Sequence, residues 1–308
     1  MKRVLISDRT HPVLEERLRA AGLDVSVEPE HNYDTLLRAV QGYDALVVRS
    51  KVIIDRAFID ACPTLRCIGR VGAGMETIDV DYAESRGVQC LNSPEGNRDA
   101  VGEHTVGLLL ALLNNIARAD AEVRQGRWRR EANRGHELGN LSVGIIGFGN
   151  MGQAFAKRLA GFGCQIIYYD IKDLEDINDH KVHKVTLTEL QAQADVVSFH
   201  VPLTDKTHHY LSADFIGRMA KSFYLLNTSR GAVVDTEALV DGLESGKVLG
   251  AALDVLENEN MQADSLSTLN PKLLTHNCVF TPHVAGWTIE SKYKLAAVLA
   301  DKLIDALQ

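Results

Sequence analysis

The sequence predicts two α/β domains, each built on a parallel sheet. Short apolar runs alternate with helix-like segments in two successive series along the 308 residues, which is the pattern of parallel strands joined by helical crossovers. A G-x-G-x-x-G motif lies between a strand and a helix of the second series. The expected fold class is therefore α/β, with two Rossmann-like or flavodoxin-like parallel-sheet domains and a cleft between them.

The first series ends near Asn97. Its expected strands are VLIS, VSV, ALVV, RCIG and VQCL, and the helix-like segments between them are PVLEERLRAAG, TLLRAVQG, RAFIDAC and VDYAESRG. A long helical tract, from about Ala100 to Arg124, separates this series from the second.

The second series begins with VGIIG. Its other expected strands are IIYYD, VVSFH, FYLLN, GAALD and CVFTP, and the segments AFAKRLAG, ADFIGRMA and TEALVDGLESG show the helical period between them. The last segment with that period, residues 289–307, has no strand after it. It is therefore free to pack back on the first domain.

Composition excludes several classes of protein. With 45% hydrophobic and 24% charged residues the chain is globular, and a net charge of −8 argues against a nucleic-acid surface. The basic run RQGRWRR, residues 124–130, is typical of a solvated helix end, and would also suit a small anionic ligand or a partner. Five cysteines without a CxxC pair indicate reduced thiols in a cytoplasm and predict no metal site.

Neither a secretion signal nor a membrane span is expected. The apolar run after the basic residues of MKRVLISD is too short for a signal-peptide core. The longest apolar run, VGLLLALL at residues 106–113, is far below the ~20 residues that cross a bilayer. A cytoplasmic protein is expected.

The glycine motif predicts a dinucleotide site. Gly147 permits a tight turn, Gly149 lets the backbone approach a pyrophosphate, and Gly152 lets helix and strand pack closely. Asn150 and Met151 begin the helix, whose unpaired N–H groups favour phosphate.

A carboxylate follows the next strand. Asp170 lies 18 residues after the third glycine, where it would bind a ribose 2′-hydroxyl. It would repel a 2′-phosphate, and Ile171 stands where an arginine could have received one. The expected cofactor is therefore NAD rather than NADP.

Three later segments, LLNTSRGAVVD, AALDVLENEN and VFTPHVAGWT, each follow a strand. Because ligands of open parallel sheets bind beyond the carboxyl ends of the strands, Arg230, Glu259 and His283 are expected in one site. An arginine can hold a carboxylate and polarise a carbonyl. A histidine can give or take the proton that accompanies a hydride, and a neighbouring glutamate favours its charged form.

These residues carry a family resemblance. The chain resembles the D-isomer-specific 2-hydroxyacid dehydrogenases over nearly its whole length, and most closely those that are short-form D-3-phosphoglycerate dehydrogenases. The matching segments are VVRSKVIID, CIGRVGAGMETIDVD, NSPEGNRDAVGEHTVGLLLALL, GFGNMG, FHVPLT, NTSRGAVVD, GAALDV and TPHVAGWT, in the family's order.

The resemblance implies roles for individual residues. His283 would be the acid/base catalyst, Glu259 its partner and Arg230 the clamp on the substrate carboxylate and carbonyl oxygen, while Ala73 and Gly74 would bind the carboxylate through backbone N–H groups. The residues implied along the cofactor are His200, Pro202, Thr207, Thr228, Asp254 and Gly286.

The resemblance also implies a domain division and an assembly. Residues 1–98 plus 287–308 would form a discontinuous substrate-binding domain, and residues 99–286 the NAD-binding domain, with hinges near Asn97 and Gly286. A homodimer would form through the long helix after residue 100. Because nothing follows Gln308, feedback control through a regulatory domain is not expected.

The sequence departs from the family at one point. Asn260 follows Glu259 where the family often has proline, which puts the placement of the loop MQADSLSTL in doubt. Glu257 lies two residues before Glu259 and could be mistaken for the histidine's partner, but the family's spacing from Asp254 selects Glu259.

The expected reaction is hydride transfer between NAD(H) and C2 of a 2-hydroxy or 2-oxo acid. Arg49, Lys51 and Arg70 would bind a phosphate, with Arg129 or Arg130 from a partner subunit, which favours 3-phosphoglycerate and phosphohydroxypyruvate, and hence serine biosynthesis. Glyoxylate/hydroxypyruvate reductase or another D-2-hydroxyacid dehydrogenase stays as an alternative, and so does a protein of another class, an NADH-sensing corepressor.

Overall fold

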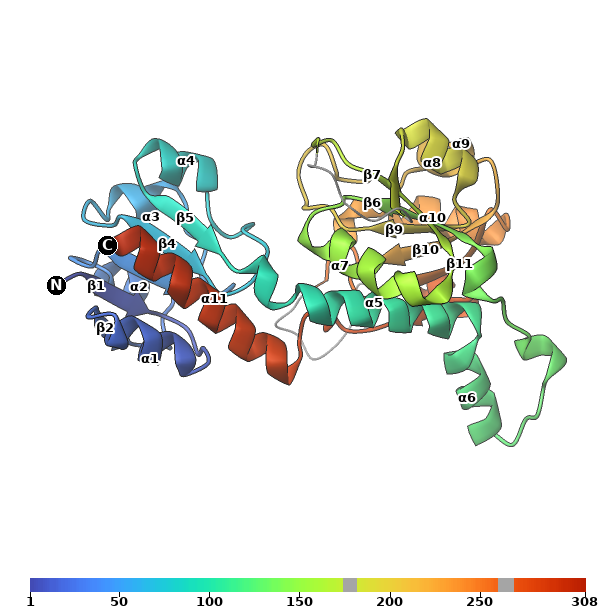
Figure 1. Cartoon of the computed structure of the whole chain (residues 1–308), viewed down its shortest axis with the longest axis horizontal. Helices are drawn as coiled ribbons and strands as arrows, with labels where there is room; N and C mark the ends of the chain where they lie inside the picture. Colours follow the sequence, from blue (N-terminus) through green and yellow to red (C-terminus); the bar gives the residue numbers. More distant parts are fainter. Residues whose placement is uncertain (174–181, 260–268) are drawn as a thin grey trace. The chain divides into compact units, whose positions relative to one another are not determined.

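The computed structural model describes residues 1–173, 182–259 and 269–308. The chain divides into two compact units (Figure 1). Unit 1 contains Met1–Arg98 and Trp287–Gln308, and unit 2 contains Asp99–Gly286. The prediction of two parallel-sheet α/β domains is confirmed, because the strand pairs recorded in both sheets are parallel.

Unit 1 is built on a five-stranded sheet with the order β2-β1-β3-β4-β5, the order of flavodoxin-like folds. The strands are β1 (Arg3–Ile6), β2 (Asp24–Val27), β3 (Ala45–Val48), β4 (Cys67–Arg70) and β5 (Gln89–Asn92). The crossover helices are α1 (Val13–Ala20), α2 (Tyr33–Ala39), α3 (Arg56–Asp60) and α4 (Val80–Ser85).

The last helix, α11 (Ile289–Leu307), belongs to unit 1 and lies across its sheet (Figure 1). It begins with a capping box between Thr288 and Ser291. Leu299 and Leu303 pack on Gly69 of β4, where an added Cβ would come within 3.3 Å of both. The helix thus completes a core that neither sheet face nor helix could bury alone.

Unit 2 is built on a seven-stranded sheet with the order β12-β11-β10-β9-β6-β7-β8. The strands are β6 (Ser142–Ile146), β7 (Gln165–Tyr169), β8 (Val182–Lys184), β9 (Val196–Phe199), β10 (Phe223–Asn227), β11 (Val248–Leu253) and β12 (Cys278–Phe280). The helices are α5 (Arg98–Leu113), α6 (Ile116–Arg124), α7 (Asn150–Leu159), α8 (Leu187–Gln193), α9 (Ala213–Arg218) and α10 (Thr236–Glu244). Every residue of β6, β9 and β10 is buried, as expected for parallel strands covered on both faces.

Unit 2 differs from the sequence prediction in two places. β8 and α8 were not expected; β8 has only three residues, of which Val182 alone is buried, so it carries almost no apolar signal. The helical tract expected from about Ala100 to Arg124 is two helices, because Asn115 adopts a left-handed conformation with φ 54°.

Among the described residues, no single helix is long and apolar enough to cross a membrane. The pair α5 and α6 reaches the required length and composition only together, and it is bent by 62°. In α5, Leu108, Leu109 and Leu112 are buried in the core of unit 2.

Replacing Gly152 with Ala should destabilise unit 2. An added Cβ would lie 2.2 Å from the backbone oxygen of Gly147, and overpacking of this kind costs ~1–3 kcal/mol of unfolding free energy. Gly161→Ala is the control, because no atom in the described parts of the chain lies within 4 Å of its Cβ position, and it should change stability by only ~0.5 kcal/mol. Denaturant unfolding of both variants measures the difference, and equal stabilities would refute the close packing.

Candidate active site

The turn between β6 and α7 is shaped by its glycines. Gly147 has φ 87°, and a Cβ there would lie 2.6 Å from the backbone oxygen of His200. By contrast, no atom of the described residues lies within 4 Å of the Cβ position of Gly149. Gly149 is also the N-cap of α7 and supplies no side-chain cap. The first turn of α7, with Asn150 and Met151, thus offers N–H groups beside open space.

Asp170 ties the end of β7 to this turn. One carboxylate oxygen, Oδ2, accepts a hydrogen bond from the N–H of Phe148 at 2.7 Å, and Oδ1 accepts one from the N–H of Lys172 at 2.8 Å. The carboxylate is therefore fixed at the edge of the glycine turn, where a ribose would follow a bound pyrophosphate.

His200 follows β9 and lies against the same turn. Its Nε2 is 2.8 Å from the hydroxyl of Ser198, and its buried Nδ1 has no hydrogen-bond partner in the described parts of the chain. Burial lowers the pKa of His200 to about 3. The imidazole of His200 is therefore neutral at physiological pH. An uncharged side chain at this position suits a contact with a cofactor.

The remaining predicted cofactor residues lie in the loops after β9 and β10 and near the end of unit 2. The hydroxyl of Thr207 donates to the backbone oxygen of Pro202 at 2.6 Å, which closes a tight turn. The hydroxyl of Thr228 is 3.1 Å from that of Thr105 in α5. Gly286 is the last residue of unit 2.

Asn227 shapes the turn that presents Arg230. Its fully buried amide accepts hydrogen bonds from the N–H and hydroxyl of Ser229 and donates to the backbone oxygen of Arg230. The guanidinium of Arg230 donates from Nη1 to the oxygen of Ser229 at 2.6 Å. Next to it, Gly231 packs so tightly on the Leu256 carbonyl that a Cβ would come within 1.9 Å.

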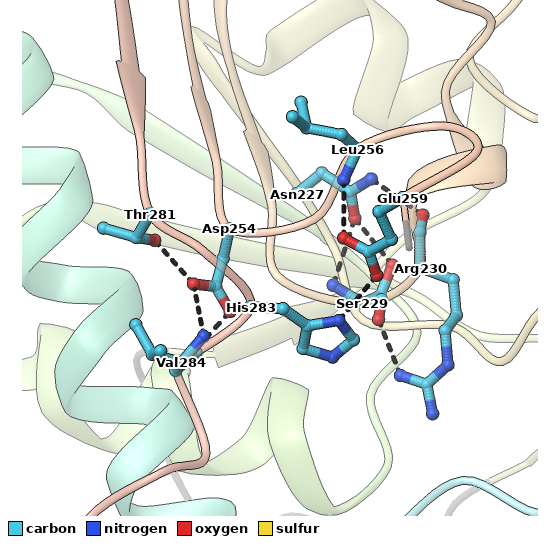
Figure 2. A network of polar contacts seen from close by, with 10 residues as sticks. Asn227, Ser229, Arg230, Asp254, Leu256, Glu259, Thr281, His283 and Val284 are labelled. Carbon is cyan, nitrogen blue, oxygen red and sulfur yellow. Dashed lines mark hydrogen bonds and ion pairs between the residues drawn. The ribbon is translucent and has the colours of Figure 1, made fainter. Parts of the chain in front are cut away.

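His283 and Glu259 form a hydrogen-bonded pair (Figure 2). His283 Nδ1 lies 2.6 Å from Glu259 Oε1, and Glu259 Oε2 accepts from the N–H of Leu256. An ionised glutamate selects the tautomer with hydrogen on Nδ1. The other nitrogen, Nε2, has no partner among the described residues, so it is available to exchange a proton.

Asp254 holds the loop that carries His283. It is 1% exposed, and its carboxylate accepts hydrogen bonds from the hydroxyl of Thr281 and the N–H groups of Val284 and Ala285 (Figure 2). Burial acts to raise the pKa of Asp254, but hydrogen bonds from His104, Thr281 and the loop outweigh it, and the pKa is lowered. These hydrogen bonds fix the backbone of the loop, in which His283 adopts a left-handed conformation with φ 54°.

Glu257 bonds to a different histidine. Its Oε1 lies 2.5 Å from His209 Nε2, and its Oε2 accepts from the hydroxyl and N–H of Thr236. Of the two acidic residues in this turn, Glu259 is therefore the one that contacts His283. Asn260 and most of the loop MQADSLSTL lie outside the described residues.

In unit 1, two arginines lie at the carboxyl ends of neighbouring strands. Arg70 is the last residue of β4, and Arg49 follows β3, whose Val48 pairs with Arg70. The Arg49 guanidinium lies 4.8 Å above the ring of Trp287. The Arg70 guanidinium lies on Gly72, where a Cβ would come within 1.6 Å of Nη1.

The loop after β4 is held from behind. Ser93 binds the N–H and carbonyl of Gly72, and the amide of Asn92 donates to the carbonyl of Ala73. The N–H groups of Ala73 and Gly74 have no acceptor within the described residues. They are therefore suited to bind an anion.

Several residues that build these sites are not predicted by the sequence patterns. They are Asn227, which folds the Arg230 turn, Thr281 and His104, which bind Asp254, and His209, which binds Glu257. Asn227 and Thr281 lie within the segments LLNTSRGAVVD and VFTPHVAGWT, whose position at strand ends the sequence predicts. His104 and His209 gave no signal, because their partners are 150 and 48 residues away.

Comparison with known proteins identifies the class. The family model of the D-isomer specific 2-hydroxyacid dehydrogenase, NAD binding domain, matches residues 106–285. Hydroxypyruvate reductase of Thermotoga maritima is 37% identical over 92% of both chains. Glyoxylate reductase of Thermofilum pendens is 38% identical over 89% of this chain and 81% of that protein. D-3-phosphoglycerate dehydrogenase of Archaeoglobus fulgidus is 34% identical over 98% of this chain, which spans 57% of that protein.

Solved structures agree. A glyoxylate reductase from Paecilomyes thermophila superposes with a TM-score of 0.88 at 26% identity, covering 100% of this chain and 95% of that one. D-lactate dehydrogenase from Aquifex aeolicus, complexed with NAD and lactic acid, gives 0.82 at 26% identity, covering 99% and 94%.

The chain is therefore an NAD-dependent oxidoreductase that acts on hydroxyl and oxo groups. It belongs to the D-isomer specific 2-hydroxyacid dehydrogenase family, as the sequence predicted. The glycine turn fits the cofactor, because it combines close packing at Gly147 and Gly152 with open space at Gly149.

Asp170→Ser combined with Ile171→Arg should shift cofactor preference toward NADPH. The change removes a carboxylate that repels a 2′-phosphate and adds a cation to bind it, and a hydrogen bond to a charged group contributes ~1.5–3 kcal/mol, or ~10–150-fold. The ratio of kcat/KM for NADPH and NADH measures the shift. Asp173→Asn, which removes an exposed carboxylate paired with Lys184, should leave the ratio unchanged; an unchanged ratio in the double variant would remove Asp170 from cofactor selection.

Proposed function

We propose that the protein reduces a 2-oxoacid to the D-2-hydroxyacid with NADH and catalyses the reverse oxidation. The observation that carries this proposal is the His283–Glu259 pair, at 2.6 Å, beside the turn of Arg230. When bound, NAD(H) supplies or accepts the hydride at C2.

Each side chain then has one task. In reduction, His283 donates the proton from Nε2 to the carbonyl oxygen, and Glu259 stabilises the imidazolium before the transfer. Arg230 binds the carboxylate and the carbonyl oxygen, where negative charge develops. Asp254 and the hydrogen bonds it accepts keep the His283 loop in place without entering the reaction.

We propose residues 1–98 and 287–308 as the substrate-binding domain and residues 99–286 as the NAD-binding domain. The cofactor residues would be Gly147, Gly149, Asn150, Met151, Gly152, Asp170, His200, Pro202, Thr207, Thr228, Asp254 and Gly286. The N–H groups of Ala73 and Gly74, which have no acceptor among the residues that the structure describes, support their proposed binding of the substrate carboxylate. A homodimer in the cytoplasm is part of the proposal, and the five free cysteines are compatible with that compartment.

For the substrate we propose a phosphorylated three-carbon acid, 3-phosphoglycerate, and its oxidised form, phosphohydroxypyruvate, which would place the enzyme in serine biosynthesis. The supporting observation is the group of cations at the carboxyl ends of β3 and β4, namely Arg49, Lys51 and Arg70, with one buried carboxylate, Asp8, beside the first two. The N–H of Arg49 donates to Asp8 at 2.7 Å and Lys51 lies 4.0 Å from it. These four side chains together carry a net positive charge, which suits a phosphate.

A second candidate is the reduction of glyoxylate or hydroxypyruvate. The relatives with those names match over most of their own length, 92% and 81%, whereas the dehydrogenase of A. fulgidus is matched over 57%. In that case the Arg49 guanidinium, which already stacks on Trp287, would shape the pocket wall instead of binding phosphate. Steady turnover of any of these acids would exclude an NADH-sensing corepressor.

Glu259→Gln should make reduction fail at a lower pH. The neutral amide no longer pairs with the imidazolium, so reduction should lose its activity at a lower pH than in the wild-type enzyme. The pH profile of kcat/KM for hydroxypyruvate measures this. Glu244→Gln, which removes an exposed carboxylate paired with Lys272, should keep the wild-type profile, and so should Glu259→Gln if the proposed role is wrong.

Arg70→Ala should raise KM selectively for the phosphorylated substrate. Loss of a charge-assisted contact with phosphate costs ~1.5–3 kcal/mol, or ~10-fold or more in KM for phosphohydroxypyruvate, with much less effect on glyoxylate and hydroxypyruvate. Arg66→Ala is the control, since Arg66 is exposed and lies just before the opposite end of β4. An equal rise for all three acids would contradict phosphate selection by Arg70.

A further inference from the structure

The turn after β11 contains two carboxylate–imidazole pairs. Glu259 binds His283 at 2.6 Å, and Glu257 binds His209 at 2.5 Å. Asn258 lies between the two glutamates in a left-handed conformation with φ 59°, which turns their side chains toward different partners. Only the first pair has a task in the reaction proposed above.

His209 joins three loops at the carboxyl edge of the sheet. It lies in the loop after β9, with φ 50°, and its N–H donates to the carbonyl of Ala232 at 2.8 Å. Two residues on, Leu211 forms a bridge with Val234. The backbone of the His209 loop is thus bound to the segment that directly follows Arg230, while its imidazole is bound to Glu257 of the next loop.

Glu257 extends the same connection to α10. Its second oxygen accepts the hydroxyl of Thr236 at 2.7 Å and the N–H of Thr236 at 3.2 Å. Gly231 lies directly on the backbone of this turn, since a Cβ there would come within 1.9 Å of the Leu256 oxygen and 2.6 Å of the Glu257 nitrogen. Any shift of the turn would therefore move Glu259 relative to the Arg230 segment.

We propose that His209 and Glu257 form a positioning pair, which holds the turn so that Glu259 stays in contact with His283. The inference rests on the proposed roles of Glu259 and His283. His209 touches none of the proposed reacting groups. It acts through the Glu257 turn, and it thereby determines how strongly Glu259 stabilises the His283 imidazolium.

The charges around His209 favour this arrangement. The acidic groups facing it are Glu257 and, from the N-cap of α10, Asp235 at 3.9 Å, while the ring of His208 stacks on it at 4.0 Å. Burial acts to raise the pKa of Glu257, but hydrogen bonds from Thr236 and His209 outweigh it and lower the pKa. A partly buried carboxylate that loses its histidine would be left under-bonded and would draw in water or shift its turn.

The test uses the intact enzyme with NADH and hydroxypyruvate, and compares His209→Ala, His209→Gln and His208→Gln. His209→Ala should lower kcat ~10-fold, which is the effect of losing about one charge-assisted hydrogen bond, and should move the pH limit of reduction downward, with NADH affinity by fluorescence kept within twofold. The amide of His209→Gln can still donate a hydrogen bond to Glu257. This variant should therefore keep most of the wild-type kcat and a pH limit close to that of wild type. His208→Gln, in the same loop without a carboxylate partner among the described residues, should behave like wild type.

A double-mutant cycle with Glu259→Gln separates positioning from a purely structural role. Because His209 acts through Glu259, adding His209→Ala to Glu259→Gln should change kcat less than twofold and leave the pH profile where Glu259→Gln put it. Additive effects, or a fall in thermal stability with an unchanged pH profile, would overturn the positioning pair alone. A wild-type profile for Glu259→Gln would overturn the proposed function and the positioning pair together. If His209→Ala does not fold, Glu257→Gln takes its place in the cycle.

Discussion

The buried carboxylate of Asp254 is the constraint on which the site depends. A charge that is 1% exposed is tolerable only when its oxygens are fully hydrogen-bonded, and this one is bonded by the Thr281 hydroxyl and the N–H groups of Val284 and Ala285. These three donors belong to the segment that contains His283, and His104 of α5 lies 3.5 Å from the same carboxylate. Satisfying the buried charge therefore fixes the backbone of the loop that carries His283, whose left-handed conformation would otherwise be unfavourable.

The next level is built on the end of the same strand. The turn after Asp254 places Glu257 and Glu259 two residues apart, and the left-handed Asn258 lets one carboxylate bind His209 and the other His283. We infer that both hydrogen-bonded pairs are needed to keep this turn in one position. Because the Arg230 segment packs on its backbone through Gly231, the elements proposed for proton transfer and for carboxylate binding are held in register by ordinary hydrogen bonds and close packing.

Sequence reasoning succeeded where the signal is local. The buried strands and α11 followed from apolar runs and helical period, and the glycine turn from spacing within a few residues. It failed where the cause is distant or weak: β8 has one buried residue, and the break at Asn115 depends on a single backbone conformation. His209 and Glu257 pair across 48 residues, so no pattern within either segment could have indicated the contact.

The two units bear differently on identity and on substrate. The family model matches residues 106–285, all within unit 2, and this unit contains Arg230, Glu259 and His283, which we propose act on the oxo-acid group that all the named substrates share. Arg49 and Arg70, proposed to meet the variable remainder of the substrate, are in unit 1. Relatives called hydroxypyruvate reductase, glyoxylate reductase and D-3-phosphoglycerate dehydrogenase are 34–38% identical to this chain. Under the proposed roles, the loops of unit 2 serve the reaction that these substrates share, and the cations at the ends of β3 and β4 distinguish a phosphate from a hydroxyl.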